Sequence, residues 1–264
     1  MVVSRSQFLY NFGVSKIFLS VVIPSYDEMA NLQKGVLDKI EHFLSKKKYS
    51  YEVIIVDDGS TDGSIEFVKN FSSDNPNFQV IENPHLGKAG SVTTGMLRSK
   101  GEYILFSDMD QATPIEEVDK LLSYFSKDYD IVIGSRKSQR KGAPWTRRLM
   151  ARGMIFLRTL LVNIHGISDT QCGFKMFKRQ AAQKLFDRIN KMHTNFKKVS
   201  GSSVSAGFDV ELLYIAQKMG YKIKEVPVNW LYVETRRVNP IRDSIAGIVD
   251  IIKIKIKDSK GKYR

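Results

Sequence analysis

Cysteine is almost absent from this sequence: Cys172 is the only one among 264 residues. A single thiol excludes an internal disulfide, which fits a protein kept in a reducing compartment. No evident base lies near Cys172 in the sequence, so we expect a packed side chain rather than a nucleophile.

Long apolar runs are also missing. A membrane-spanning helix needs roughly 18 or more consecutive apolar residues, and the apolar stretch 153–164 is shorter and contains Arg158. Residues 1–16 lack the continuous apolar region of a signal peptide, so we interpret them as a leader. The sequence therefore predicts no helix that crosses a bilayer.

Positive charge, in contrast, is abundant. The chain has 41 Lys and Arg against 28 Asp and Glu, a formal net charge of +13. This excess favours an anionic partner, which could be nucleic acid, a phosphate-rich small molecule or an acidic membrane surface. No signature of a DNA- or RNA-binding module is present, so we expect no nucleic acid and keep such a module as a remote alternative.

The first half of the chain alternates apolar runs with helical patterns. Because the strands are apolar throughout, the pattern predicts an α/β fold whose central sheet is mostly parallel and flanked by helices. In such sheets ligands bind beyond the carboxyl ends of the strands. The expected strands cover 18–23, 51–56, 78–82, 103–107 and 130–135, and the expected helices cover about 30–46, 63–72, 89–99 and a stretch from Pro114.

The second half is less regular. We expect a basic helix over 145–163, a loop over 168–179, a Ser/Gly-rich stretch over 195–207, a helix over 208–220 and an extended segment over 221–233. Residues 239–264 form a basic, amphipathic C-terminal segment, in which a helical face gathers Ile241, Ile245, Ile248, Val249 and Ile252. The alternating "KIKIKIK" leaves a strand open. We therefore divide the chain into the leader, a catalytic domain over 17–238 and this segment.

Two carboxylates follow the expected strand 103–107, in "SDMDQ". Asp108 and Asp110 repel each other unless a cation lies between them. A hard divalent ion such as Mg²⁺ or Mn²⁺ takes oxygen ligands and leaves positions for substrate phosphates. Gln111 could add a carbonyl oxygen. The alternative is an acidic turn that caps the next helix.

Further polar residues follow the other strands. Asp57 and Asp58 end the second strand, where one of them could accept hydrogen bonds from a nucleotide, or both could simply form a turn. Lys88 stands at a glycine-flanked helix start, which favours phosphate. Arg136 ends the fifth strand, and Arg147 and Arg148 follow it.

These motifs occur in a familiar order. "SVVIPSYDE", "VIIVDDGSTDGS", "NPHLGKAGSV", "ILFSDMDQATP", "IVIGSR", "DTQCGFKMF", "FDVELLYIA" and "EVPVNW" together resemble family 2 glycosyltransferases of the GT-A fold. The likeness is greatest to the dolichyl-phosphate (polyprenyl-phosphate) glucosyl- and mannosyltransferases and covers roughly residues 17 to 250.

The resemblance implies a role for each matching residue. The nucleotide-sugar site would comprise Pro24, Tyr26, Glu28, Asp57, Asp58, Lys88, Asp108, Met109 and Asp110. Asp108, Asp110 and Gln111 would hold Mg²⁺ or Mn²⁺, and the catalytic residues would be Asp110, Asp169 and Arg136. The acceptor phosphate would meet Arg136, Arg147, Arg148 and Arg237.

Two positions depart from the family pattern. Arg237 stands in "TRRVNP", where relatives often have lysine in a stretch like "GSKVNP". Met109 separates the paired acids where relatives often have a small residue, and we expect its side chain to point into the core.

The implied reaction moves a hexose, glucose in the first place, from a nucleotide-sugar to a polyprenyl (dolichyl) phosphate with inversion, which gives a β-linked product. UDP-glucose is the favoured donor and GDP-mannose the second. A lipid phosphate scarcely needs a general base. A hydroxyl acceptor would need one, and Asp169 and Asp209 are the candidates, although Asp169 fits better as a positioning group and Asp209 as a helix anchor.

The resemblance leaves several alternatives open. A family 2 enzyme that acts on a glycan or protein hydroxyl is the nearest rival, and a degenerate protein that binds without turnover is another. We expect a peripheral protein at the cytoplasmic face of a membrane, with a membrane-protein partner or a second copy as possible companions. The C-terminal segment either lies on anionic lipid or packs on the domain.

Overall fold

A computed structural model describes residues 17–136, 161–162, 164–193, 196, 206–231 and 240–263. Several expectations lie outside these ranges: the leader, all but the end of the helix over 145–163, and most of the Ser/Gly-rich stretch. Arg147, Arg148 and Arg237 also lie outside them.

One seven-stranded sheet organises the described residues, in the order β3-β2-β1-β4-β6-β5-β7. All neighbouring strands run parallel except β6, which is antiparallel to both β4 and β5. The α/β fold with a mostly parallel sheet is thus confirmed. The strands are β1 (Leu19–Ser25), β2 (Tyr51–Asp57), β3 (Phe78–Glu82), β4 (Tyr103–Ser107), β5 (Ile131–Ser135), β6 (Phe174–Lys178) and β7 (Ile223–Pro227).

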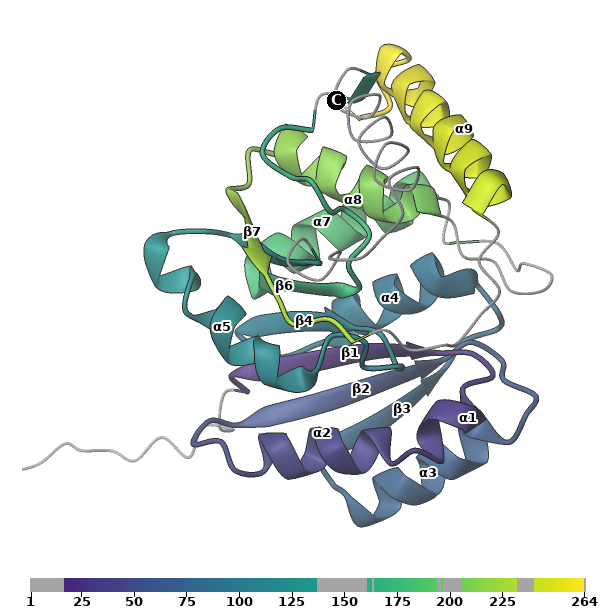
Figure 1. The fold of residues 1–264 in the computed structure, drawn as a ribbon, viewed down its shortest axis with the longest axis vertical. Coiled ribbons are helices and arrows are strands. Elements are labelled where there is room, and N and C mark those ends of the chain that lie inside the picture. The colour runs from purple at the N-terminus through teal and green to yellow at the C-terminus, as the bar shows by residue number, and fades with distance from the viewer. Residues whose placement is uncertain are drawn as a thin grey trace, which may run out of the picture.

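Helices cover both faces of the sheet (Figure 1). One buried cluster joins the sheet to α2 (Val36–Leu44), α3 (Ser64–Asp74) and α5 (Val118–Leu122), and the other joins it to α4 (Gly87–Arg98), α7 (Arg179–Met192) and α8 (Ala206–Lys218). Apolar side chains on alternating positions of each strand feed both clusters, as a doubly covered sheet requires.

Two expected helices are broken in the structure. The expected helix over 30–46 is divided into α1 (Met29–Leu32) and α2, because Gly35 between them adopts a left-handed φ of 69°. The stretch after Pro114 forms a short 3₁₀ turn, η1 (Ile115–Glu117), before α5, and a second one, η2 (Phe125–Lys127), after it.

The expected loop over 168–179 is wrong in its second half, which forms β6. Lys175 interrupts the apolar pattern of this strand, yet its side chain is fully buried. Its ammonium donates to Asp209 Oδ1 at 2.5 Å and to the Cys172 carbonyl at 2.7 Å. A paired lysine thus occupies a core position of a strand. The amphipathic helix α7, which follows directly, was also missed.

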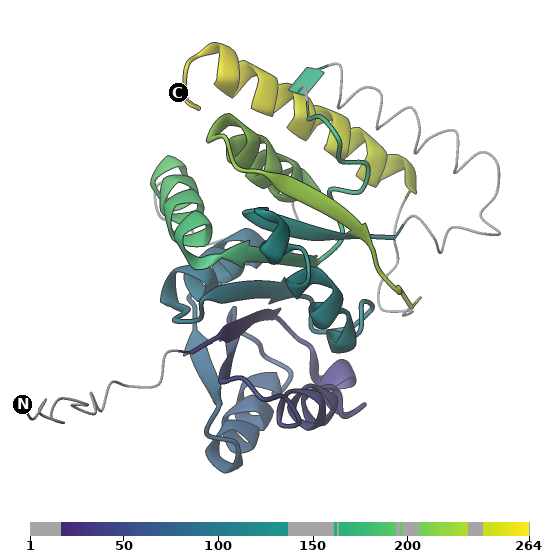
Figure 2. The same cartoon turned by 90° about the vertical axis from the view of Figure 1, so that its left-hand side faces the viewer.

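The C-terminal segment is helical, so the strand alternative is wrong. Helix α9 (Pro240–Ser259) lies along α8 (Figure 2). Ile251 and Ile254 on one of its faces, and Tyr263 beyond its end, are buried in the same core cluster as α8. Among the described helices, none is long and apolar enough to cross a membrane.

Candidate functional site

Three neighbouring parallel strands, β2, β1 and β4, end at the same edge of the sheet, which we call the rim. Ser25 of β1 stands opposite Asp57 of β2 in the register. Asp108 follows β4 directly, and Arg136 follows β5. The structure therefore brings the acids and Arg136 to one rim, as the strand pattern predicted.

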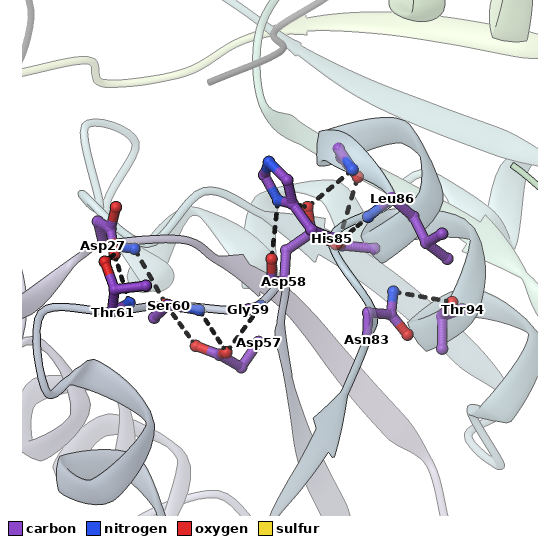
Figure 3. A network of polar contacts seen from close by, with 12 residues as sticks. Asp27, Asp57, Asp58, Gly59, Ser60, Thr61, Asn83, His85, Leu86 and Thr94 are labelled. Carbon is purple, nitrogen blue, oxygen red and sulfur yellow. Dashed lines mark hydrogen bonds and ion pairs between the residues drawn. The ribbon is translucent and has the colours of Figure 1, made fainter. Parts of the chain in front are cut away.

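Asp57 organises the turn that follows β2. Its Oδ1 accepts hydrogen bonds from the backbone N–H of Gly59 at 3.0 Å and of Ser60 at 2.9 Å, and its Oδ2 accepts one from Ser60 Oγ at 2.6 Å. Figure 3 shows this turn beside Asp27, which accepts a hydrogen bond from Thr61 N at 2.8 Å. Asp57 therefore shapes the turn, whatever it contributes to a ligand.

Asp58 binds the loop that precedes α4. Its carboxylate accepts hydrogen bonds from Leu86 N and Gly87 N, both at 2.7 Å, and from Ser91 Oγ at 2.9 Å. It is 2% exposed. Because every one of these donors belongs to the start of α4, Asp58 fixes the position of that helix start, where Lys88 stands.

His85 is a rim residue that the sequence reasoning missed. Its Nδ1 lies 2.9 Å from the Asp58 carbonyl oxygen and 3.0 Å from Asp58 Oδ2, so Nδ1 carries a proton (Figure 3). Its ring stacks on Tyr26, with centroids 4.5 Å apart. Both rings are partly exposed. No motif signalled this pair, since the two residues are far apart in the sequence.

Asp108 and Asp110 form the acidic centre of the rim. Burial, together with the charge of Asp108, raises the pKa of Asp110. Lys88 Nζ lies 2.6 Å from Asp108 Oδ1. Burial lowers the pKa of Lys88, but the negative charge of Asp108 outweighs burial, so the pKa of Lys88 is raised. The lysine therefore supplies part of the positive charge that the paired acids need.

The oxygens near the acidic centre fit a divalent cation. Gln111 donates through Nε2 to Ser107 Oγ and to the Asp108 carbonyl, while its Oε1 is buried without a hydrogen-bond partner. Two carboxylates and a free amide oxygen match the ligand preference of Mg²⁺ and Mn²⁺. Among the described residues, no group of three or more His, Cys, Asp or Glu side chains is placed to hold a metal ion.

Gly173 lies directly against the Asp108 carboxylate. A Cβ at this position would stand 1.8 Å from Asp108 Oδ2. The Gly173 carbonyl also accepts a hydrogen bond from Asp108 N at 3.1 Å. The glycine of "QCGFK" therefore leaves the space that the Asp108 side chain occupies.

Arg136 and Asp169 form a second charged centre. The guanidinium donates through Nε and Nη2 to the two carboxylate oxygens of Asp169, each at 2.8 Å, and lies over the Trp230 ring. Burial lowers the pKa of Arg136, but the Asp169 hydrogen bonds outweigh burial and raise it. Asp169 thus orients Arg136.

The other residues singled out in the sequence lie in a strand, in a local hydrogen bond or in the core. Pro24 belongs to β1, and Glu28 accepts a hydrogen bond from Asn31 Nδ2 at 2.5 Å. Met109 is 2% exposed and packs in the core, as expected from the sequence. Cys172 is buried, and burial raises the pKa of its thiol to about 11, so the expected packed thiol is confirmed.

Residues 20–186 match the family described as "Glycosyl transferase family 2". This chain belongs to that family. The match spans the strands from β1 to β6, the acidic centre and the Arg136–Asp169 pair, so the resemblance read from the motifs is confirmed.

Curated relatives resemble this family 2 glycosyltransferase over nearly its whole length. The dolichyl-phosphate beta-glucosyltransferase of Dictyostelium discoideum is 34% identical, covering 92% of this chain and 76% of the relative. The enzymes of that name from Saccharomyces cerevisiae and Homo sapiens are each 33% identical, covering 94% and 93% of this chain and 77% of each relative.

Solved structures share the GT-A fold. Glucosyl-3-phosphoglycerate synthase from Mycobacterium tuberculosis in complex with UDP aligns with a TM-score of 0.57 at 16% identity, covering 90% of this chain and 80% of that one. The mannosyltransferase PcManGT from Pyrobaculum calidifontis, in complex with GDP-Man and Mn²⁺, aligns with a TM-score of 0.54 at 19% identity, covering 83% and 57%. At these identities the likeness concerns the fold alone.

Proposed function

We propose that this glycosyltransferase moves glucose from UDP-glucose to a dolichyl (polyprenyl) phosphate, with inversion at the anomeric carbon. The observation that carries the proposal is the similarity, at about one-third identity over more than nine-tenths of the chain, to enzymes named dolichyl-phosphate beta-glucosyltransferase. GDP-mannose is the second donor that we consider.

The acidic centre is the proposed place of the donor's diphosphate. Asp108, Asp110 and the free Oε1 of Gln111 would hold Mg²⁺ or Mn²⁺, which supplies positive charge to the leaving nucleoside diphosphate. Lys88 stands in the first turn of α4, where the N–H groups of Leu86 and Gly87 already donate to Asp58, so the proposed phosphate contact is the Lys88 ammonium. Its ammonium adds charge where the leaving group becomes more negative.

The proposed nucleotide site lies over the ends of β1 and β2. The Tyr26–His85 pair offers a flat, partly exposed surface against which a base can stack. Pro24, Glu28 and Asp57, at or just after the ends of β1 and β2, are the further residues that we propose for it. Asp58 acts on this site indirectly, because its carboxylate is engaged by His85, Leu86, Gly87 and Ser91, at and before the start of α4.

The acids near the second charged centre favour a phosphate acceptor over a hydroxyl. A hydroxyl acceptor requires a general base. Asp169 is held by Arg136, and Asp209 lies 2.5 Å from the buried Lys175. Both candidate bases are thus engaged in close ion pairs, so neither carboxylate is free to take a proton from an acceptor hydroxyl. Arg136, with Arg147, Arg148 and Arg237, is the proposed set that meets the acceptor phosphate.

A donor titration tests the proposal first. We expect UDP-glucose to bind more tightly than GDP-mannose in calorimetry, and to bind only with Mn²⁺ or Mg²⁺ present. Asp110→Asn should abolish the metal-dependent binding of the donor. The control Asp74→Asn replaces an exposed carboxylate on α3 and should bind the donor like the wild type. Tight binding of UDP-glucose without any divalent ion would contradict the metal assignment.

Turnover tests the acceptor. We expect glucose transfer to a short-chain polyprenyl phosphate in detergent, and none to an oligosaccharide. Transfer to the oligosaccharide alone would favour an enzyme that acts on a hydroxyl acceptor, and donor binding without any transfer would favour a degenerate protein.

We also propose that this enzyme lies at the cytoplasmic face of a membrane. The single cysteine agrees with a reducing compartment on that side.

A further inference from the structure

Helix α9 is apolar on two opposite faces. Ile251 and Ile254 are each 3% exposed and pack in the core cluster of α8. The opposite face carries a row of exposed residues that we call the α9 stripe: Ile245 (57% exposed), Val249 (42%), Ile252 (44%) and Ile256 (48%).

The α9 stripe is one continuous surface. Its members follow each other at intervals of four, three and four residues, so they lie on one side of the helix. The row is about 16 Å long at 1.5 Å per residue. Only one other large apolar side chain among the described residues is exposed to this degree, Leu231. Single exposed apolar residues are ordinary, but an aligned row marks an interaction surface.

Charge is distributed unevenly around the helix. Lys253, Lys255 and Lys260 are exposed near the stripe, and Lys253 also pairs with Asp250 Oδ1 at 3.3 Å. The acids of α9 whose side chains are described turn toward α8, since Asp250 accepts a hydrogen bond from Gly207 N at 3.1 Å and Asp258 is ion-paired with Lys218. The outer side of α9 is therefore apolar with a positive border.

The helix is rigidly connected to the catalytic domain. Glu211 of α8 is 6% exposed and accepts hydrogen bonds from Lys257 Nζ at 2.9 Å and from Tyr263 Oη at 2.5 Å. Figures 1 and 2 both show that α9 begins on the side of the molecule toward which the carboxyl ends of the parallel strands point. Whatever binds the stripe is therefore held in a fixed relation to the rim.

We propose that the α9 stripe docks on an anionic lipid bilayer, with the helix lying in the plane of the interface. The stripe enters the acyl boundary, while the lysine stems extend along it and their ammonium groups meet lipid phosphates. The inference rests on the proposed function in one respect: it explains how the rim reaches a phosphate carried by a membrane lipid.

Vesicle binding without any donor tests the docking directly. The full chain should co-sediment with vesicles of phosphatidylcholine and phosphatidylserine, and much less with phosphatidylcholine alone. Ile252→Ser combined with Ile256→Ser should reduce binding by about tenfold or more. Leu231→Ser is the matched control for an exposed apolar residue outside the stripe, and it should bind like the wild type.

Charge-removing variants separate the two contributions. Lys253→Gln with Lys260→Gln should weaken binding to anionic vesicles by about tenfold, and added salt should reduce that difference. Lys39→Gln with Lys184→Gln removes the same charge from α2 and α7 and should have little effect. If the two double variants lose vesicle affinity to the same degree, the assignment to α9 is overturned, because the net charge of the protein would then explain the binding.

Activity distinguishes this proposal from the proposed function. The stripe variant should keep transfer to a short-chain polyprenyl phosphate in detergent and lose it with the acceptor embedded in vesicles. If the wild type transfers no glucose in detergent or in vesicles, the proposed function is contradicted. The lipid docking of the α9 stripe is then tested by vesicle binding alone. A dimer in sedimentation velocity that the stripe variant dissociates, without vesicle binding, would overturn the lipid assignment in favour of a second copy.

Discussion

Replacement of Gly173 by alanine should displace the Asp108 carboxylate and weaken metal binding. Gly173 is not among the glycines with positive φ, so alanine meets no backbone strain there. The added Cβ would lie 1.8 Å from Asp108 Oδ2 and 2.3 Å from Cγ, whereas real Cβ atoms essentially never approach within 3.0 Å. The carboxylate must therefore retreat by about 1.2 Å or swing away, which a side chain near the surface can do.

The expected magnitude follows from this displacement. A misplacement of about 1 Å at a reacting centre costs roughly a hundredfold in rate, and a disturbed support of a metal ligand costs about 10–100-fold in affinity. Overpacking should cost about 1–3 kcal/mol of stability at most. We therefore expect Gly173→Ala to fold, with Mn²⁺-dependent donor affinity reduced by about 10–100-fold.

Calorimetric titration of UDP-glucose at several Mn²⁺ concentrations measures the effect, and urea unfolding measures stability. Gly134→Ala is the matched control, because its Cβ would meet Val228, Cys172 and Phe174 at 3.1–3.3 Å, without touching Asp108. It should lose some stability and keep its metal affinity. The reasoning is refuted if Gly173→Ala binds Mn²⁺ and donor as the wild type does, or if Gly134→Ala loses metal affinity to the same degree.

Three further predictions concern charged side chains. Lys88→Met should tighten Mn²⁺ binding in the absence of donor, because the competing ammonium is removed from Asp108, and should weaken UDP-glucose binding in the same calorimetric titration. Asp58→Ala leaves the donors of the α4 loop unpaired and should cost about 2–3 kcal/mol in urea unfolding. Burial alone would raise the pKa of Glu211, but its donors His193, Tyr263 and Lys257 lower it to about 2 from 4.5. The ionised carboxylate therefore contributes about 3 kcal/mol at most to the free energy of unfolding. This contribution is complete above pH 4.5 and is lost as the pH falls toward 2. Glu211→Gln should therefore be less stable than the wild type at pH 7, with a difference that shrinks in urea unfolding below pH 4.5; a difference independent of pH would exclude this origin.

The parallel half of the fold was predictable because its strands are uniformly apolar. The strands from β1 to β5 lie where the runs predicted them, and the alternation with helices predicted a mostly parallel sheet. The order of the strands in the sheet was not predicted. β6 was hidden for two reasons. Its central Lys175 breaks the apolar run, and the partner that neutralises it, Asp209, comes from a distant helix. Local pattern contains no information about such a pairing.

The site was predictable to the extent that strand ends reveal it. Asp57, Asp58 and Asp108 were proposed because each stands at or just after the end of a strand, and the parallel strands bring these ends to one rim. The specific partners of these residues were not predictable. The hydrogen bonds of Asp58 to the start of α4 and the stacking of His85 on Tyr26 involve residues that only the fold brings together. Both depend on loop conformations, including a positive φ of 53° at His85.

The electrostatics of the rim indicate where the chain leaves charge uncompensated. Asp58 accepts several backbone and side-chain donors, and Asp169 is held by Arg136. Asp110 differs: it accepts a hydrogen bond from Ala112 N, yet burial and Asp108 still raise its pKa. A buried carboxylate whose neutral form is favoured gains from a cation in addition to the lysines that already act on it, Lys88 and Lys34. This deficit at Asp110, together with the unpaired side-chain oxygen of the next residue, Gln111, is the physical argument for the proposed metal shared with the donor's diphosphate.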